Sequence, residues 1–200
     1  MRKLLVFGFM TALLARADGG AMSAGERSYL LDQLEQSQKA MLASIDGLTQ
    51  AQWTFKPSAT AWSVQECAEH IVLAESYIFD GAQQILKTPA VARPEKSNAT
   101  VDHILVERVQ DRSQKATAPE PLVPGRKFAT PADAAKAFTE AREKTIAYVK
   151  STGDDLRTHV GPGPAGQMDA YQFLLLLASH SARHTAQIRE VEANPGYPAN

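Results

Sequence analysis

Residues 169–191 read Asp169-Ala-Tyr-Gln-Phe-Leu-Leu-Leu-Leu-Ala-Ser-His180-Ser-Ala-Arg-His184-Thr-Ala-Gln-Ile-Arg-Glu-Val191. Apolar side chains recur here at the spacing of an amphipathic helix, and the two histidines occupy the middle of the apolar stripe. One helical turn separates the histidines, so both imidazoles leave the same face about 6 Å apart along the axis. An inward-facing histidine pair is typical of a shared proton, a water network or a metal, and a metal requires a third ligand.

A second amphipathic stretch, which begins at Ser63, offers a third inward-facing histidine. His70 lies at the edge of its apolar stripe. Two further histidines are weaker candidates: a surface role is favoured for His103 in a connecting segment, and His159 lies in a Gly/Pro-rich loop at the opposite end, which excludes it as a ligand. The candidate ligands are therefore His70 together with the pair on the later helix.

Four long amphipathic patterns, each with its own start signal, predict four helices. The first helix begins with Ser23 and Glu26 and ends at Gly47, and the second begins with Ser63 and Glu66 and ends before Pro89. The third begins with Thr130-Pro131 and Asp133 and ends at Gly153, and the fourth begins with Asp169 and Gln172 and ends at about Ala193. Each start is a side-chain cap followed three residues later by an acidic or amide residue. No segment shows sustained strand alternation. The sequence therefore predicts an all-α four-helix bundle.

The lengths of the connections predict the topology. Residues 48–62 and 154–168 suit antiparallel neighbours, whereas the Pro-rich residues 88–129 are far longer than a hairpin requires. A crossover of this length returns the chain along the whole bundle, which predicts an up-down-down-up order. We expect a short helix at Val101–Val109, capped by Thr100, inside the crossover.

This topology places the three imidazoles at a similar depth. The second and fourth helices run antiparallel in it, and a rise of 1.5 Å per residue puts His70 about 10 Å from one end and His184 about 13 Å from the matching end. The same arrangement places four aromatic residues at the end where the site opens, namely Trp53, Phe55, Trp62 and Phe128.

The composition limits the class of protein. Two hundred residues with 44% hydrophobic content and no internal repeat form one domain with a core of its own. A net charge of −1, without a basic run, excludes a nucleic-acid surface. The single cysteine excludes an intrachain disulfide, and Cys67, on the core face, is interpreted as a small buried apolar residue.

The N-terminus has the pattern of a secretory signal. Arg2-Lys3 precedes an apolar run to Leu14 and an Ala15-Arg16-Ala17 cleavage pattern. We therefore expect residues 1–17 to be a signal peptide ahead of a domain at 23–193, and the protein to be exported or periplasmic. The run is too short for a stable membrane anchor. The alternative is a start at Met22 and a cytoplasmic protein.

Two motifs resemble those of the DinB-like superfamily of metal-binding four-helix bundles. They are Trp62-Ser-Val-Gln-Glu-Cys-Ala-Glu-His70 and His180-Ser-Ala-Arg-His184-Thr-Ala-Gln-Ile188, and the resemblance spans about residues 23–193. It implies a divalent metal ion, commonly zinc or nickel, bound by His70, His180 and His184. Some branches of this superfamily resemble thiol S-transferases or thiol-dependent isomerases, and others resemble metal-dependent hydrolases. The export signal departs from the transferase pattern, because small thiols are mainly cytosolic.

The sequence does not identify a general base. Glu66 is explained by its capping box, Tyr77 fits an oxyanion donor or an interfacial core residue equally well, and Gln187 faces inward where it can orient an imidazole. Three neutral imidazoles leave a coordination position open, as in catalytic sites. A metal-dependent hydrolase of a small-molecule substrate is favoured over a thiol S-transferase.

Two alternatives to an enzyme stay open. The first is a non-catalytic metal- or ligand-binding bundle that acts in a stress response. The second is a histidine cluster without a metal, in which the rings bind one another and buried water. The oligomeric state also stays open, because pairing through outer faces would give a homodimer.

Overall fold

The computed structural model describes residues 21–95 and 97–199, and these form a helical bundle with one small hairpin. The elements are α1 (Ala24–Ile45), α2 (Gln50–Thr54), α3 (Val64–Ile85), α4 (Ala99–Gln110), the 3-10 helix η1 (Glu120–Leu122), α5 (Pro131–Ser151), β1 (Val160–Gly163), β2 (Gly166–Asp169) and α6 (Ala170–Glu192). The predicted signal peptide, residues 1–17, lies outside the described residues. Within the described residues, no helix has the length and apolar character needed to cross a membrane.

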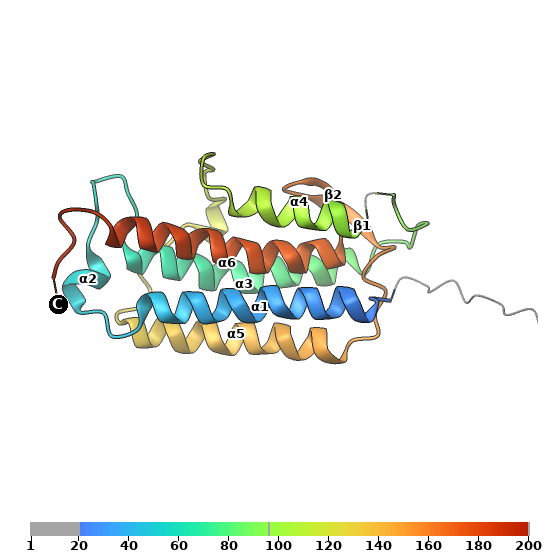
Figure 1. The fold of residues 1–200 in the computed structure, drawn as a ribbon, viewed down its shortest axis with the longest axis horizontal. Coiled ribbons are helices and arrows are strands. Elements are labelled where there is room, and N and C mark those ends of the chain that lie inside the picture. The colour runs from blue at the N-terminus through green and yellow to red at the C-terminus, as the bar shows by residue number, and fades with distance from the viewer. Residues whose placement is uncertain (1–20, 96, 200) are drawn as a thin grey trace, which may run out of the picture.

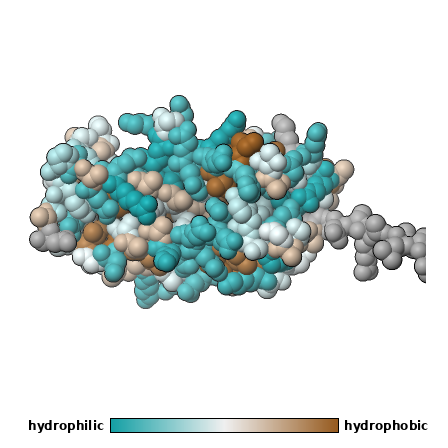
Figure 2. Space-filling view, viewed as in Figure 1, coloured by the Kyte–Doolittle hydropathy of each residue, from teal (hydrophilic) through white to brown (hydrophobic). Residues whose placement is uncertain are grey.

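Four long helices, α1, α3, α5 and α6, lie side by side, and α4 packs along the outside of α6 (Figure 1). The predicted helical-bundle class is therefore confirmed. Figure 2 shows a mostly hydrophilic face with small separate hydrophobic patches, as expected when the apolar stripes of the helices face inward.

The expectation that the chain contains no strands is wrong. β1 and β2 form an antiparallel hairpin in which Val160 pairs with Asp169 and Gly163 with Gly166. Each strand has four residues, and the segment is rich in Gly and Pro, so it carries no alternating pattern. Gly166 adopts a φ of +97° at the turn, a conformation that glycine tolerates.

The four predicted capping boxes are present, and they set the starts of the long helices. The side chains of Ser23, Ser63, Thr130 and Asp169 each accept from the backbone N–H three residues on, and the side chain at that position accepts from the cap's own N–H. The predicted start of the short crossover helix is wrong. Asn98, rather than Thr100, caps α4 by accepting from the Val101 N–H at 3.1 Å, which agrees with the strong preference for Asn at this position.

One apolar cluster shows which helix ends lie together. It contains residues from the last turns of α1 and α6 and from the first turns of α3 and α5, including Met41, Ile45, Val64, Ala134 and Ile188. Trp53 of α2 is fully buried in the same cluster. This cluster closes the end of the bundle nearer His184 of α6.

A buried ion pair links the four long helices at one level of the bundle. The guanidinium of Arg142 (α5) donates to both carboxylate oxygens of Glu75 (α3), at 2.5 and 2.9 Å, and both side chains are 1% exposed or less. Arg142 also donates to the Leu34 carbonyl and the Ser37 hydroxyl of α1, and to the Ser181 hydroxyl of α6. The network therefore fixes the part of α6 that carries the histidine pair.

A second buried arginine holds the opposite end together. Arg157, which precedes β1, is fully buried and forms ion pairs with Glu26 of α1, Asp102 of α4 and Asp169 at the start of α6. Its guanidinium also lies 3.7 Å from the centre of the Tyr171 ring. Neither arginine network was predicted from the sequence.

Candidate metal centre

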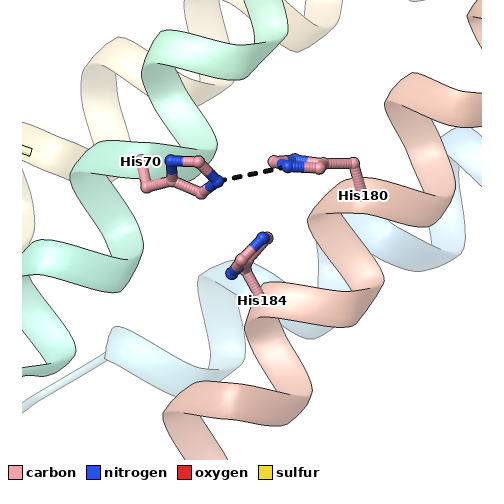
Figure 3. Close-up of side chains that lie close together, drawn as sticks. All are labelled: His70, His180 and His184. Atoms are coloured by element: carbon pink, nitrogen blue, oxygen red, sulfur yellow. Dashed lines mark hydrogen bonds between the residues drawn. The ribbon is translucent and has the colours of Figure 1, made fainter. Parts of the chain in front are cut away.

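The three predicted histidines converge at one place in the bundle. His70 projects from α3, His180 and His184 project from α6, and the three rings point toward one another (Figure 3). One ring nitrogen from each lies within 4.8 Å of the other two. The Nε2 atoms of His70 and His180 are 3.2 Å apart, and the ring centroids are separated by 4.3–4.8 Å.

The Nδ1 atoms of two rings are bound outside the cluster. His70 Nδ1 donates to the Leu122 carbonyl at 2.7 Å, and His184 Nδ1 donates to Gln187 Oε1 at 2.8 Å. Since a carbonyl oxygen only accepts, each of these Nδ1 atoms carries the proton, and Nε2 keeps its lone pair for the cluster. His180 Nδ1 is buried without a hydrogen-bond partner among the described residues. Gln187 therefore orients an imidazole, as its inward position predicted.

A guanidinium fixes the amide that binds His184. Arg112, just beyond α4, donates to Gln187 Oε1 at 3.3 Å and to both Glu190 oxygens at 2.5 and 2.7 Å. A guanidinium only donates, so the Gln187 atom that it faces is the oxygen. Sequence reasoning missed both Arg112 and Leu122. Each comes from the crossover, where no local pattern marks a side chain or carbonyl that faces the site.

Burial keeps the three imidazoles neutral. His70 is 2% exposed, and the other two rings are partly buried. Burial, together with the repulsion that a charged His180 would feel from His70 and Arg183, lowers the pKa of His180 to about 3. Burial and the other two rings lower the pKa of His184 to about 2. Burial also lowers the pKa of His70, against a hydrogen bond to Leu122 that raises it. Each imidazole is therefore neutral at neutral pH and keeps one lone pair.

One of the four aromatic residues expected at the opening contacts the site. The Trp62 ring lies 4.8 Å from that of His70 and 6.0 Å from that of His184. Trp53 lies at the expected end of the bundle, but α2 turns its side chain into the core, where its Nε1 donates to the Phe128 carbonyl. Phe55 packs edge-on against Tyr197 instead. Phe128 is partly buried against the cluster that closes this end of the bundle.

The remaining histidines lie apart from the cluster. His159 Nδ1 donates to the Thr88 carbonyl at 2.6 Å, just beyond the end of α3 that is far from the site. His103 is exposed and stacks on Tyr29 with a centroid separation of 4.6 Å. The positions of His159, at the end away from the cluster, and of His103, on the surface, agree with those expected from the sequence.

Three further predictions concern residues near His70 in sequence. Cys67 is fully buried in the core, and burial raises the pKa of its thiol to about 12, so the apolar interpretation is confirmed. Glu66 completes the capping box with Ser63 and also pairs with Lys56 at 2.8 Å. The core position considered for Tyr77 is wrong, because this residue is 53% exposed.

Comparison with known proteins places the chain in a family. Residues 33–188 match the family model described as the DinB superfamily. The chain belongs to the DinB superfamily. All three clustered histidines of this DinB protein lie within the matched residues.

A curated relative and a solved structure resemble this DinB protein along most of its length. The uncharacterized protein YuaE of Bacillus subtilis (strain 168) is 27% identical over 149 residues, which cover 74% of this chain and 88% of that protein. YfiT from Bacillus subtilis is described as a probable metal-dependent hydrolase with an unusual four-helix bundle topology. Its structure matches with a TM-score of 0.59 at 15% identity, over 89% of this chain and 92% of that one. At this identity the likeness shows the shared fold.

Proposed function

We propose that this DinB superfamily protein is a metal-dependent hydrolase that holds one divalent ion with His70, His180 and His184. The observation that carries the proposal is the 3.2 Å distance between the Nε2 atoms of His70 and His180. Two nitrogens that bind one tetrahedral ion at about 2.0–2.1 Å lie about 3.4 Å from each other. The spacing of the rings therefore fits a shared cation, and imidazole donors suit zinc or nickel.

The surrounding residues prepare the rings for this role. The Leu122 carbonyl and the Gln187 amide oxygen hold the protons of His70 and His184 on Nδ1, so that Nε2 faces inward. The Trp62 ring covers two of the imidazoles and limits the access of water on that side. When bound, a divalent ion supplies Lewis acidity, which activates water or a thiol near neutral pH.

Two further points favour a hydrolase. A site with three protein ligands leaves a coordination position for substrate or water, as catalytic rather than structural sites do. YfiT, which shares the fold, is described as a probable metal-dependent hydrolase. A thiol S-transferase ranks behind it because the signal-like residues 1–17 favour export, away from the cytosolic thiol pool.

One observation favours a second function, a non-catalytic metal-binding bundle of the stress response. Among the described residues, the hydrogen-bond partners of the three rings are a carbonyl, an amide and another imidazole, and none is a carboxylate. The nearby Glu66 carboxylate is occupied by its capping box and by Lys56. A general base is therefore missing from the contacts of the rings.

Turnover separates these functions. The zinc- or nickel-loaded protein is incubated with a panel of esters and amides, before and after chelation, beside the variants His184→Ala and His103→Ala. A hydrolase loses turnover on chelation and in His184→Ala, and keeps it in the surface control. A transferase requires an added thiol. Metal binding without turnover on either panel would refute the hydrolase and favour the binding bundle.

The proposal includes an up-down-down-up order for α1, α3, α5 and α6. The shared cluster of the last turns of α1 and α6 with the first turns of α3 and α5 supports this order. The hydrogen bond from Gln65, at the start of α3, to the Phe128 carbonyl, just before α5, supports it further. Antiparallel α3 and α6 bring His70 to the depth of the α6 pair.

A further inference from the structure

The crossover passes the metal centre in a strained turn. Arg126, with a φ of +63°, is the one non-glycine residue with positive φ within the described part of the chain. The left-handed conformation is costly for a residue with a Cβ, and it persists where surrounding contacts hold it. Its side chain is 63% exposed, so packing of the side chain does not explain the conformation.

A buried carboxylate holds this turn. One oxygen of Glu69 accepts from the Gly125 N–H at 2.9 Å, and the other accepts from the Lys127 N–H at 2.8 Å. These two amides flank Arg126, and its left-handed conformation allows both to face the same carboxylate. Glu69 is 3% exposed, so both bonds are shielded from water.

The same segment provides the partner of His70. Leu122, three residues before Gly125, is buried, and its carbonyl accepts from His70 Nδ1 at 2.7 Å. Glu69 and His70 are consecutive in α3, so two neighbouring residues hold the two ends of residues 122–127. A shift of the turn would move the carbonyl that keeps the His70 proton on Nδ1.

We propose that Glu69 is a positioning residue for the metal centre. Its carboxylate holds the Arg126 turn, and the turn holds the Leu122 carbonyl against His70 Nδ1. The Nε2 atom of His70 is therefore unprotonated and faces the cluster. The part of this inference that concerns metal affinity rests on the proposed function, whereas the part that concerns the His70 tautomer does not.

Glu69→Gln tests the clamp. A glutamine side chain has one acceptor oxygen, whereas the Gly125 and Lys127 N–H groups each bind a separate oxygen of the carboxylate. Nitrogen-15 NMR of the metal-free protein at pH 7.5 reports the tautomer of each histidine. We expect His70 to be protonated on Nδ1 in the wild type and to become a mixture of tautomers in the variant. Zinc affinity, measured by competition with a chromophoric chelator, should weaken about tenfold.

Glu66→Gln is the matched control. It removes the same charge from the same helix one turn earlier, and a glutamine still completes the capping box. It weakens the contact of Glu66 with the Arg126 side chain at 3.3 Å but leaves the two backbone hydrogen bonds to Glu69 in place, so it separates these two supports of the turn. Its His70 tautomer and zinc affinity should equal those of the wild type within about twofold. A folded Glu69→Gln protein with unchanged tautomer and affinity would overturn the inference. A wild type that binds neither zinc nor nickel while its tautomer responds to Glu69→Gln would refute the proposed function and keep the inference.

Two exposed substitutions test the turn without altering α3, even if Glu69→Gln does not fold. Arg126→Gly removes the cost of the left-handed conformation, and Arg126→Val increases it, while both remove the same contact with Glu66. We expect zinc affinity and the Nδ1 tautomer to be kept in the glycine variant and both to weaken in the valine variant. Identical behaviour of the two variants would contradict the role of the turn.

Discussion

The Nε2 atoms of His70 and His180 lie 3.2 Å apart, although the residues are 110 positions apart in the chain. This contact requires α3 and α6 to pack at one particular height. The Glu75–Arg142–Ser181 network joins the same two helices close to both histidines, with Ser181 directly after His180. The geometry of the candidate centre and the stability of the bundle therefore depend on shared contacts.

The buried ion pair gives a prediction on stability. Arg142→Met leaves the Glu75 carboxylate buried without its cation, so we expect the free energy of unfolding to fall by about 3–5 kcal/mol. The double variant Arg142→Met/Glu75→Leu replaces both charges with apolar groups and should recover most of this loss. Urea denaturation measures both values. A double variant as unstable as the single one would contradict the explanation by an uncompensated charge.

Gln187 gives a prediction on metal affinity. Gln187→Leu removes the oxygen that accepts from His184 Nδ1, so the ring is free to rotate and to change tautomer. Zinc affinity should weaken by about 10–100-fold. Gln36→Leu, an exposed position on α1, makes the same chemical change away from the site and should leave the affinity unchanged. Equal affinities for the two variants would show that the Gln187 contact does not orient the ring.

The lowered histidine pKa values give a prediction on pH. His184 has a pKa of about 2 in the folded protein and about 6.5 when unfolded, so the unfolded chain binds more protons between these values. The stability contributed by neutral His184 is fully present above pH 6.5 and is lost as the pH falls toward the folded pKa. In the metal-free protein, His184→Gln should reduce the dependence of unfolding free energy on pH between 6 and 5 by roughly 1 kcal/mol per pH unit. Parallel curves for variant and wild type, from urea unfolding, would contradict the buried neutral state.

Local patterns accounted for the four long helices and for the three histidines, whereas α2 and the 3-10 helix were not predicted. A capping box involves residues three positions apart, so Ser63 with Glu66 and Asp169 with Gln172 could be recognised directly. The histidine pair was recognisable because the helical period places residues four apart on one face. The connection lengths then placed His70 at a depth similar to that of the pair, since a long crossover constrains which helices run antiparallel.

Features that depend on distant partners could not be predicted from the sequence. The Arg142–Glu75 contact joins residues 67 positions apart, and the Leu122 carbonyl meets a ring 52 positions away. Neither an arginine nor a backbone carbonyl indicates in the sequence which distant residue it will contact. Thr100 was expected to cap the crossover helix, whereas the side chain of Asn98 caps α4. The hairpin escaped notice because its Gly/Pro-rich strands lack alternation.

Metal content is the most direct test of the central claim, that three imidazoles from α3 and α6 hold one divalent ion. Elemental analysis after metal-replete expression compares the wild type with His70→Ala and with His103→Ala, the exposed histidine control. We predict about one equivalent of zinc or nickel in the wild type and the control, and less than about a tenth in His70→Ala. A wild type below about a tenth of an equivalent, or a His70→Ala variant that keeps a full one, would contradict the account.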